Sequence, residues 1–215
     1  MTEQKPPRPK STARQAPHDE EVYGTLGALL GTLEVIATDD HHPLSPVQSE
    51  RVRGALRLGN AMQAQVEALL TLADDELATR LTRASLAMRP MVEHAVRGAL
   101  RGFERANVAL VMPSGEWGTQ RVQIDSSRVD RSVRALAEVL AQRVGDGGVI
   151  EVLLEQRGQH VMLTLRGRAG SGSDLKRGGL VVQGARRLFE LHGGALDLDA
   201  SGLTMIVLLP KSEAP

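Results

Sequence analysis

The sequence predicts an α+β protein in which a helical hairpin forms a dimeric four-helix bundle and an α/β sandwich with a mixed sheet follows it. Two observations support this fold class. Apolar residues recur in steps of three and four along two long stretches near the N-terminus, and short apolar strands then alternate with amphipathic helices. We expect a disordered tail over residues 1–17, the hairpin over 18–76 and the α/β domain over 77–215.

The composition excludes several kinds of site and partner. The chain has 215 residues, and its 26 Lys and Arg balance 26 Asp and Glu, so no global charge favours nucleic acid or a membrane surface. The absence of cysteine excludes disulfides, thiolate metal sites and a cysteine nucleophile. No apolar run approaches the length of a membrane span, and the N-terminus lacks the apolar region of a signal peptide. We therefore expect a cytoplasmic protein with no membrane partner.

Two helices with a common apolar pattern are predicted after the tail. The tail itself is rich in proline and basic residues, and it has almost nothing to bury. The helices run over about 18–38 and 47–73, and a polar segment with two prolines separates them. Their apolar seams are Val22, Leu26, Leu29, Leu33 and Ile36, and then Val52, Ala55, Gly59, Met62, Val66 and Leu69. One hairpin exposes this face and two hairpins bury it, so the pattern predicts a homodimer.

The elements of the α/β domain follow a connector over 74–86, in which a short strand is expected near Leu81. Amphipathic spacing predicts a helix over about 88–107. It predicts a second helix that begins at a cap, Ser126 or Ser127, and ends near 144. Short apolar runs predict strands at 108–112 and 122–125, and alternation predicts a hairpin of strands at 149–154 and 161–165. The order predicts helices on one face of a mixed sheet.

The last stretch, residues 177–210, reads as a glycine turn, an amphipathic helix and a strand pair. One helical face carries Val181, Ala185, Leu188 and His192. Gly193 and Gly194 supply the left-handed stop that such a helix needs. A strand begins at Ala195, and the nearly unbroken apolar run of 205–209 is expected to be a strand covered on both sides.

The residues Glu190-Leu191-His192-Gly193-Gly194, with Leu209-Pro210 at the end of the last strand, resemble the C-terminal part of histidine-kinase-type ATPase domains, the GHKL or Bergerat group. With the hairpin in front, the order of elements over 18–210 resembles the whole histidine-kinase core. The resemblance implies a Bergerat-type α/β sandwich behind a dimerisation and phosphotransfer hairpin.

The phosphoacceptor position of that family is not a histidine in this chain. Aligning the family's hairpin pattern on Leu29-Leu30-Gly31 places Glu20 there, and a carboxylate cannot form a phosphoramidate. No catalytic residue is assigned, although His18, two residues upstream, is an alternative acceptor if the helix is shifted. The resemblance implies a partner-binding surface at Glu20, Tyr23, Gly24 and Gly27.

The nucleotide motifs are degenerate in the same alignment. Ala135 and Val139 stand where the family carries the asparagines that hold Mg²⁺, and Gly167 stands where an aspartate accepts from adenine. In the last glycine motif, Gly179 is in register and Leu180 follows, and the lid is reduced to about 169–177. We therefore expect no cofactor; ATP and Mg²⁺ belong only to an alternative interpretation. No metal site is expected either.

These features predict a catalytically degenerate histidine-kinase-like protein of a two-component pathway, and not an enzyme. It would act as a homodimeric scaffold that binds a response-regulator receiver domain or a partner histidine kinase. Alternatives are a histidine phosphotransferase that uses His18, a divergent ATP-binding sensor kinase, and a nucleic-acid-binding dimer. The zero net charge and the lack of a helix-turn-helix signature make nucleic acid the least expected partner.

Overall fold

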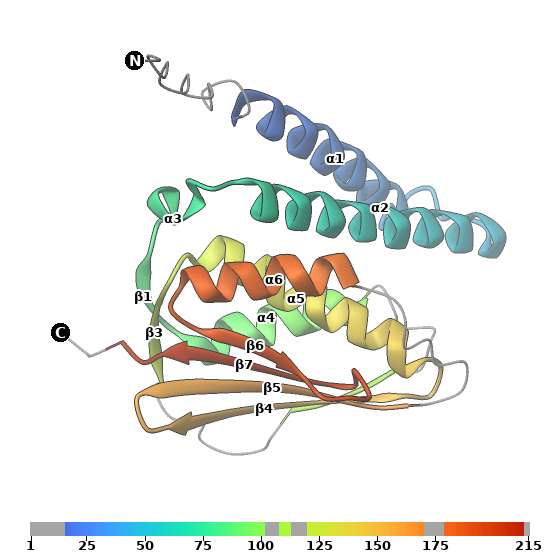
Figure 1. Ribbon diagram of the computed structural model, residues 1–215. Helices are drawn as coiled ribbons and strands as arrows, with labels where there is room; N and C mark the ends of the chain where they lie inside the picture. Colours follow the sequence, from blue (N-terminus) through green and yellow to red (C-terminus); the bar gives the residue numbers. More distant parts are fainter. Residues whose placement is uncertain (1–15, 102–107, 113–119, 170–178, 213–215) are drawn as a thin grey trace, which may run out of the picture. The chain divides into compact units, whose positions relative to one another are not determined.

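The computed structural model describes residues 16–101, 108–112, 120–169 and 179–212 (Figure 1). Contacts divide the chain into two compact units at Gly59, and each unit is described by itself. The division falls inside α2 (Pro46–Ala73), so the first part of this helix belongs to the first unit and its last part, from Asn60, to the second. The domain boundary expected at residue 76 stays a prediction.

The first unit is the helical hairpin. It pairs α1 (Ala16–Ala37) with the first part of α2, and both helices begin and end close to the predicted positions. Among the described side chains of α1, Leu26 and Leu30 are the buried apolar ones. A Cβ atom on Gly59 would lie 2.6 Å from Cδ2 of Leu30, so the absence of a side chain at this glycine lets the leucine fit against α2.

Much of the predicted seam of α1 is exposed within one chain. The side chains of Val22, Leu29 and Ile36 are 46%, 54% and 41% exposed. Apolar side chains that are aligned on one helical face and left in water favour burial against another surface.

The second unit contains a two-layer α/β sandwich. Its strands are β1 (Ala84–Ala87), β2 (Ala109–Val111), β3 (Arg121–Ile124), β4 (Val149–Arg157), β5 (His160–Arg168), β6 (Ala195–Leu198) and β7 (Thr204–Pro210). The five-stranded sheet has the order β2-β4-β5-β7-β6, in which β2 and β4 are parallel and the other neighbours antiparallel. The mixed sheet expected from the sequence is confirmed. The strands β1 and β3 pair separately as an antiparallel ribbon.

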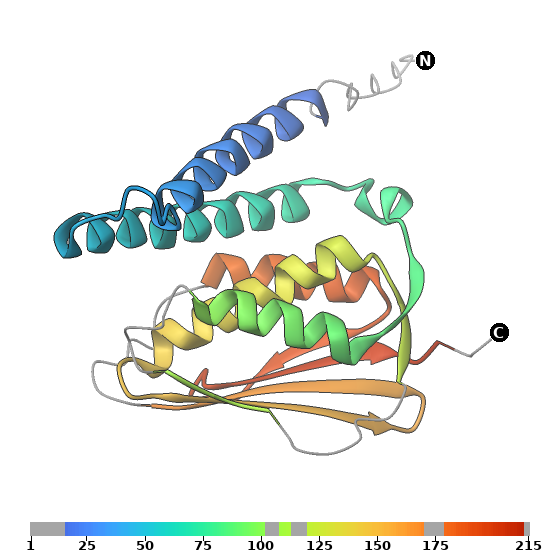
Figure 2. The ribbon, with the colours of Figure 1, turned by 180° about the vertical axis from the view of Figure 1, so that it is seen from behind.

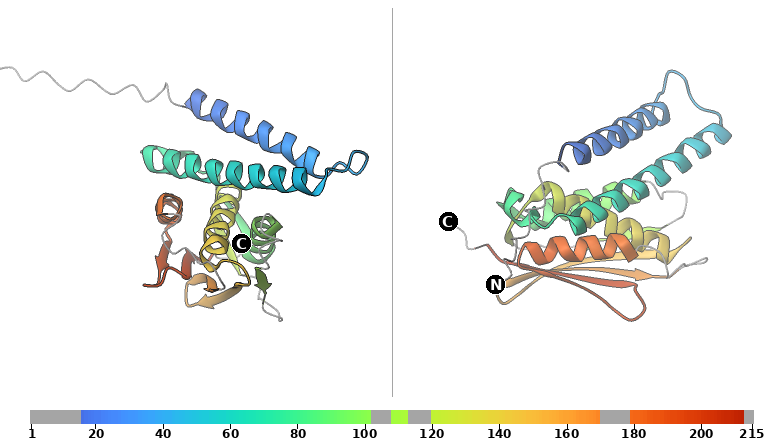
Figure 3. Two further views of the ribbon diagram at one scale, coloured as in Figure 1. Left: turned by 90° about the vertical axis from the view of Figure 1, so that its right-hand side faces the viewer. Right: turned by 45° about the horizontal axis from the view of Figure 1, so that its top comes forward.

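The helices α4 (Met88–Arg101), α5 (Ser126–Val144) and α6 (Gly179–Leu191) cover one face of the five-stranded sheet (Figure 2). An end-on view shows α5 in the middle, with α4 and α6 on either side (Figure 3). The core lies between these layers, and its largest fully buried side chains include Phe189, Leu136, Leu140, Leu163, Leu165 and Met205. The short helix α3 (Leu77–Arg80) precedes β1.

Several local expectations were wrong. Asp125, and not Ser126 or Ser127, caps α5, since its carboxylate accepts from the backbone N–H of Arg128. The connector strand begins at Ala84, not near Leu81. The run from Met205 to Leu209 is not covered on both sides: buried and half-buried residues alternate, because helices cover one face of the sheet.

The amphipathic face of α6 is confirmed. Val181, Ala185, Leu188 and His192 are buried, and Gly193 has a φ of 73°, the left-handed conformation predicted for the stop. Among the described residues, no helix is long and apolar enough to cross a membrane. Residues 1–15 of the predicted tail, residues 170–177 of the shortened lid and the last turn of the helix predicted to end near 107 lie outside the described residues.

Candidate functional site

The residues aligned with nucleotide motifs occupy different parts of the second unit. Ala135 and Val139 lie on the central helix α5, Gly167 lies in β5, and Gly179 and Leu180 begin α6. Ala135 shares a small cavity of about 20 Å³ with Val181, one residue after Leu180. Gly167 instead lies beside the C-terminal part of α5, so the structure does not gather all these positions around one space.

The space at Gly167 is filled by apolar side chains of α5. A Cβ atom on this glycine would lie 2.5 Å from Cγ1 of Val144 and 2.9 Å from Cδ1 of Leu140. Both distances are shorter than any normal carbon contact, so even an alanine requires the neighbours to move. An aspartate that faces a ligand from this position does not fit the present packing.

The last part of α2 lies between α5 and α6, and small residues permit its close approach. A Cβ atom on Gly184 of α6 would lie 2.6 Å from both Cα and Cβ of Ala68. Ala68 and Thr71 are buried, although α2 is a largely polar helix. The cavity that remains beside Ala135, about 20 Å³, has room for about one water molecule. The chain's own helix therefore covers part of the groove between α5 and α6.

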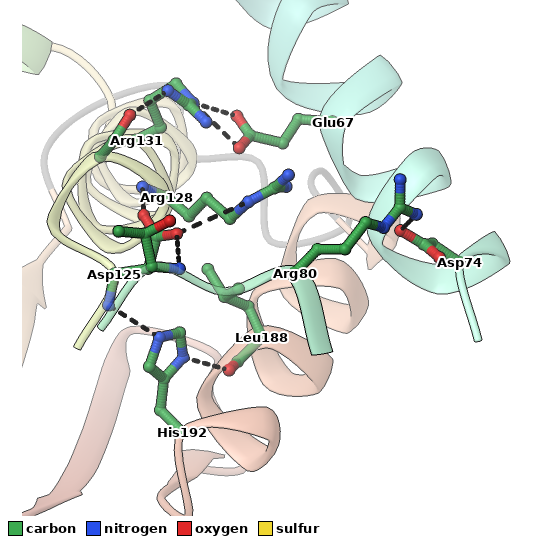
Figure 4. Close-up of polar contacts among 10 residues, drawn as sticks. Glu67, Asp74, Arg80, Asp125, Arg128, Arg131, Leu188 and His192 are labelled. Atoms are coloured by element: carbon green, nitrogen blue, oxygen red, sulfur yellow. Dashed lines mark hydrogen bonds and ion pairs between the residues drawn. The ribbon is translucent and has the colours of Figure 1, made fainter. Parts of the chain in front are cut away.

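An ion pair supports this helix contact. Nε of Arg131 in α5 donates to both carboxylate oxygens of Glu67, at 2.9 and 3.1 Å, and Nη1 donates to Oγ of Ser127 at 2.7 Å (Figure 4). The Glu67 side chain is only 14% exposed. A carboxylate that has lost most of its hydration needs such a partner, so this pair specifies how α2 meets α5.

A larger polar cavity of about 260 Å³ opens next to this ion pair. Its lining comes from the last part of α2 and from α5: Asn60, Gln63, Ala64, Glu67, Arg131, Arg134, Ala135 and Glu138. Burial raises the pKa of the Glu138 carboxyl above its usual value, and Arg134, whose Nε lies 3.3 Å from Oε1, opposes that shift. The described residues contain no group of three or more His, Cys, Asp or Glu side chains suited to a metal ion.

His192 connects the end of α6 to the start of α5, a role that the sequence did not predict. Its Nε2 accepts from the backbone N–H of Asp125 at 3.0 Å, and its Nδ1–H donates to the carbonyl oxygen of Leu188 at 2.8 Å (Figure 4). The Asp125 carboxylate also accepts from the backbone N–H of Thr82. Because burial disfavours the charged ring, the pKa of His192 is lowered from 6.5. The sequence contained a signal for this role, because His192 belongs to the Glu-Leu-His-Gly-Gly segment on which the family resemblance rests.

The partner-surface residues predicted from the resemblance all lie on α1. Gly24 and Gly27 are exposed, and a Cβ atom on either would meet nothing within 4 Å. The side chains of Glu20 and Tyr23, and that of the alternative acceptor His18, are outside the described ones. Their roles stay predictions.

No protein-family model and no curated protein sequence matches the chain. Three solved structures with similar folds are informative. The catalytic domain of histidine kinase ThkA has 15% identity and a TM-score of 0.51, over 60% of this chain and 95% of that chain. Histidine kinase AdeS of Acinetobacter baumannii has 17% identity and a TM-score of 0.52, over 88% of this chain and 96% of that chain.

The third similar structure is histidine kinase ThkA in complex with response regulator protein TrrA. It has 14% identity and a TM-score of 0.57, over 94% of this chain and 61% of that chain. At these identities the likeness concerns the fold. The chain thus has a histidine-kinase-like core fold, in which a helical region is joined to an α/β domain of the GHKL type.

Proposed function

We propose that this chain is a non-catalytic histidine-kinase-like signalling protein. It acts as a homodimeric scaffold, and it binds either the receiver domain of a response regulator or a partner histidine kinase. It neither binds ATP nor transfers phosphate from it. This proposal combines the fold with the chemistry of the positions at which a kinase of this fold would hold its nucleotide.

One observation carries the proposal: the positions aligned with nucleotide contacts bear no polar side chain, and packing fills the space at Gly167. Leu140 and Val144 occupy the space in front of Gly167. Ala135 lies where the last part of α2 meets α5, between the cavity of about 20 Å³ and the polar cavity of about 260 Å³. Aliphatic groups supply neither a metal ligand nor an acceptor for adenine. In an active enzyme, each metal or adenine contact is worth several kcal/mol.

Two observations support a receiver domain as the partner: similarity to a solved complex and an exposed surface on α1. The ThkA structure whose match covers 94% of this chain was solved in complex with a response regulator. On α1, Gly24, Gly27 and Gly31 form an exposed stripe that offers backbone and no side-chain bulk. Such a stripe lets another helix approach closely, since no Cβ atom keeps the two backbones apart.

A homodimer is supported by the exposed part of the α1 seam. Val22, Leu29 and Ile36 lie about two helical turns apart and are each more than 40% exposed. A second hairpin with the same stripe would bury them in a four-helix bundle.

The partner-surface proposal is tested by adding bulk to the glycine stripe. Gly24→Arg and Gly27→Arg are expected to weaken binding of a receiver domain, measured by biolayer interferometry, by at least tenfold, roughly 1.4 kcal/mol. Both changes leave the fold intact, because each new side chain enters open space. Val35→Arg is the matched control, since this side chain is 69% exposed and lies two turns further along α1.

Receiver domains encoded beside or co-expressed with this chain, in phosphorylated and unphosphorylated form, are the probes. Equal affinity for wild type, Gly24→Arg and Gly27→Arg contradicts the proposed surface. If neither the receivers nor purified histidine kinases bind the wild type, the scaffold function itself is contradicted.

A further inference from the structure

An exposed histidine of α4 is hydrogen-bonded to a carboxylate of the neighbouring helix. Nδ1 of His94 lies 3.1 Å from Oδ1 of Asp130 in α5, and the histidine side chain is 71% exposed. The residues following His94, Ala95 and Val96, are buried in the core. Packing of α4 on α5 therefore fixes the place of this pair, although its members are 36 positions apart in the sequence.

The hydrogen bond decides which ring nitrogen carries the proton. A carboxylate only accepts hydrogen bonds, so the neutral imidazole of His94 holds its proton on Nδ1 and donates it to Asp130. The lone pair then resides on Nε2. Since most of the ring is exposed, this nitrogen is a nucleophile whose tautomer is fixed by a second group.

Positive charge lies near the same helical turn. Arg97 is exposed one turn after His94. A Cβ atom on Gly98 would lie 3.8 Å from Cζ of Arg134, so the Arg134 guanidinium lies against this part of α4. Guanidinium groups bind phosphoryl oxygens well, because their N–H groups match the oxygen positions and their charge is permanent.

Two other described histidines differ from His94 in how their ring nitrogens are held. Both ring nitrogens of His192 are already bonded inside the core. His42 has the same type of bond, 3.1 Å from Nδ1 to Oδ2 of Asp39, but both residues belong to the hairpin loop. The Asp39 carboxylate there also accepts from the backbone N–H of His41, so it closes a local turn. His42 is thus a matched control for His94.

We propose that His94 is a phosphorylation site, which accepts a phosphoryl group on Nε2 from an acyl phosphate or a phosphoramidate. The Nε2 lone pair forms the N–P bond while the bond between phosphorus and the leaving group breaks. An acyl phosphate releases a carboxylate, and zwitterionic phosphoramidate releases ammonia. The ring retains its Nδ1 proton, and Asp130 faces the positive charge that develops on the imidazole. Asp130 is a positioning residue in this step.

The test uses the full-length chain and potassium phosphoramidate as the donor. Peptide mass spectrometry at neutral pH follows phosphoryl incorporation at each histidine. We expect His94 to be labelled about tenfold faster than His42 or the exposed His160, and ³¹P NMR to place the phosphorus on Nε2. His94→Gln removes this fastest phase, whereas His42→Gln leaves it unchanged.

The contribution of Asp130 is measured with two variants. Asp130→Ala removes the acceptor and is expected to slow labelling of His94 about tenfold, whereas Asp130→Asn keeps an acceptor oxygen and restores most of the rate. A merely structural role would not distinguish these variants when their melting temperatures agree. The proposal is overturned if His94 reacts no faster than His160, if His94→Gln labels as wild type does, or if phosphorus resides on Nδ1. None of these outcomes bears on receiver binding, so the two proposals fail separately.

Discussion

At the scale of single residues, His192 has the clearest energetic role. Its two ring nitrogens bond the backbone of Leu188 at the end of α6 and of Asp125 at the start of α5. The ring can accept at Nε2 only while it is neutral, because a protonated imidazole has no lone pair. The folded state therefore selects the neutral form, in agreement with the lowered pKa that burial causes.

This selection predicts a pH dependence of stability. The folded pKa of His192 lies below 6.5, the value taken for the unfolded chain, so the unfolded state binds the extra proton first. The contribution of the neutral ring is present above the unfolded pKa and decreases as pH falls below it towards the folded pKa. We expect the free energy of unfolding in urea to decrease between about pH 7.5 and 5.5.

The His192→Leu variant isolates this effect. It is expected to lose about 1–3 kcal/mol at neutral pH, because the N–H of Asp125 loses its acceptor, and to show a shallower decrease in acid. His160→Gln is the control, since His160 is exposed and its removal leaves the decrease in place. An identical pH profile for wild type and His192→Leu contradicts the assigned role.

At the level of helices and strands, the contact between α2 and α6 distinguishes this protein from one in which the groove between α5 and α6 is open. We expect Gly184→Ala to destabilise the protein by about 1–3 kcal/mol, since the new methyl group would lie 2.6 Å from Ala68 and a backbone must move. Gly179→Ala, at the start of the same helix, meets nothing within 4 Å and is expected to be neutral or slightly stabilising. Thermal unfolding measures both; equal melting temperatures of the two variants would show that α2 does not fill this groove.

The seam of α1 supplies a second prediction for an element. Leu29→Glu places a charge at a side chain that is 54% exposed in one chain, so a monomer tolerates it. In a four-helix bundle the same charge would be buried without a partner, at a cost of several kcal/mol. We expect wild type to be a dimer and Leu29→Glu a monomer in light scattering after size exclusion. A monomeric wild type contradicts the proposed bundle.

At the scale of the whole molecule, the sequence predicted the succession of helices and strands well, and for a physical reason. Steps of three and four in α1, α5 and α6 follow directly from burial of one helical face. The alternation in β4 and β5 follows from a sheet with one covered face. The α5 cap was misassigned because Asp125, Ser126 and Ser127 are all good caps, and only the backbone geometry distinguishes them.

The packing around the candidate site could not be predicted from the sequence. The contact of Ala68 with Gly184 joins small residues more than a hundred positions apart, and such residues produce no apolar periodicity. The pairing of His94 with Asp130 likewise depends on how two helices meet. The loss of nucleotide contacts stays a prediction, which rests on the side chains of Ala135, Val139 and Gly167, since none of them can hold Mg²⁺ or accept from adenine.

We propose that this histidine-kinase-like fold has no working nucleotide site. Isothermal calorimetry of ATP with Mg²⁺ added to the full-length protein tests it most directly. We expect no saturable heat up to about 1 mM ATP, because Ala135, Val139 and Gly167 offer no metal ligand or adenine acceptor and Leu140 and Val144 fill the space at Gly167. A saturable isotherm with one nucleotide per chain, reproduced with ADP, would contradict the account.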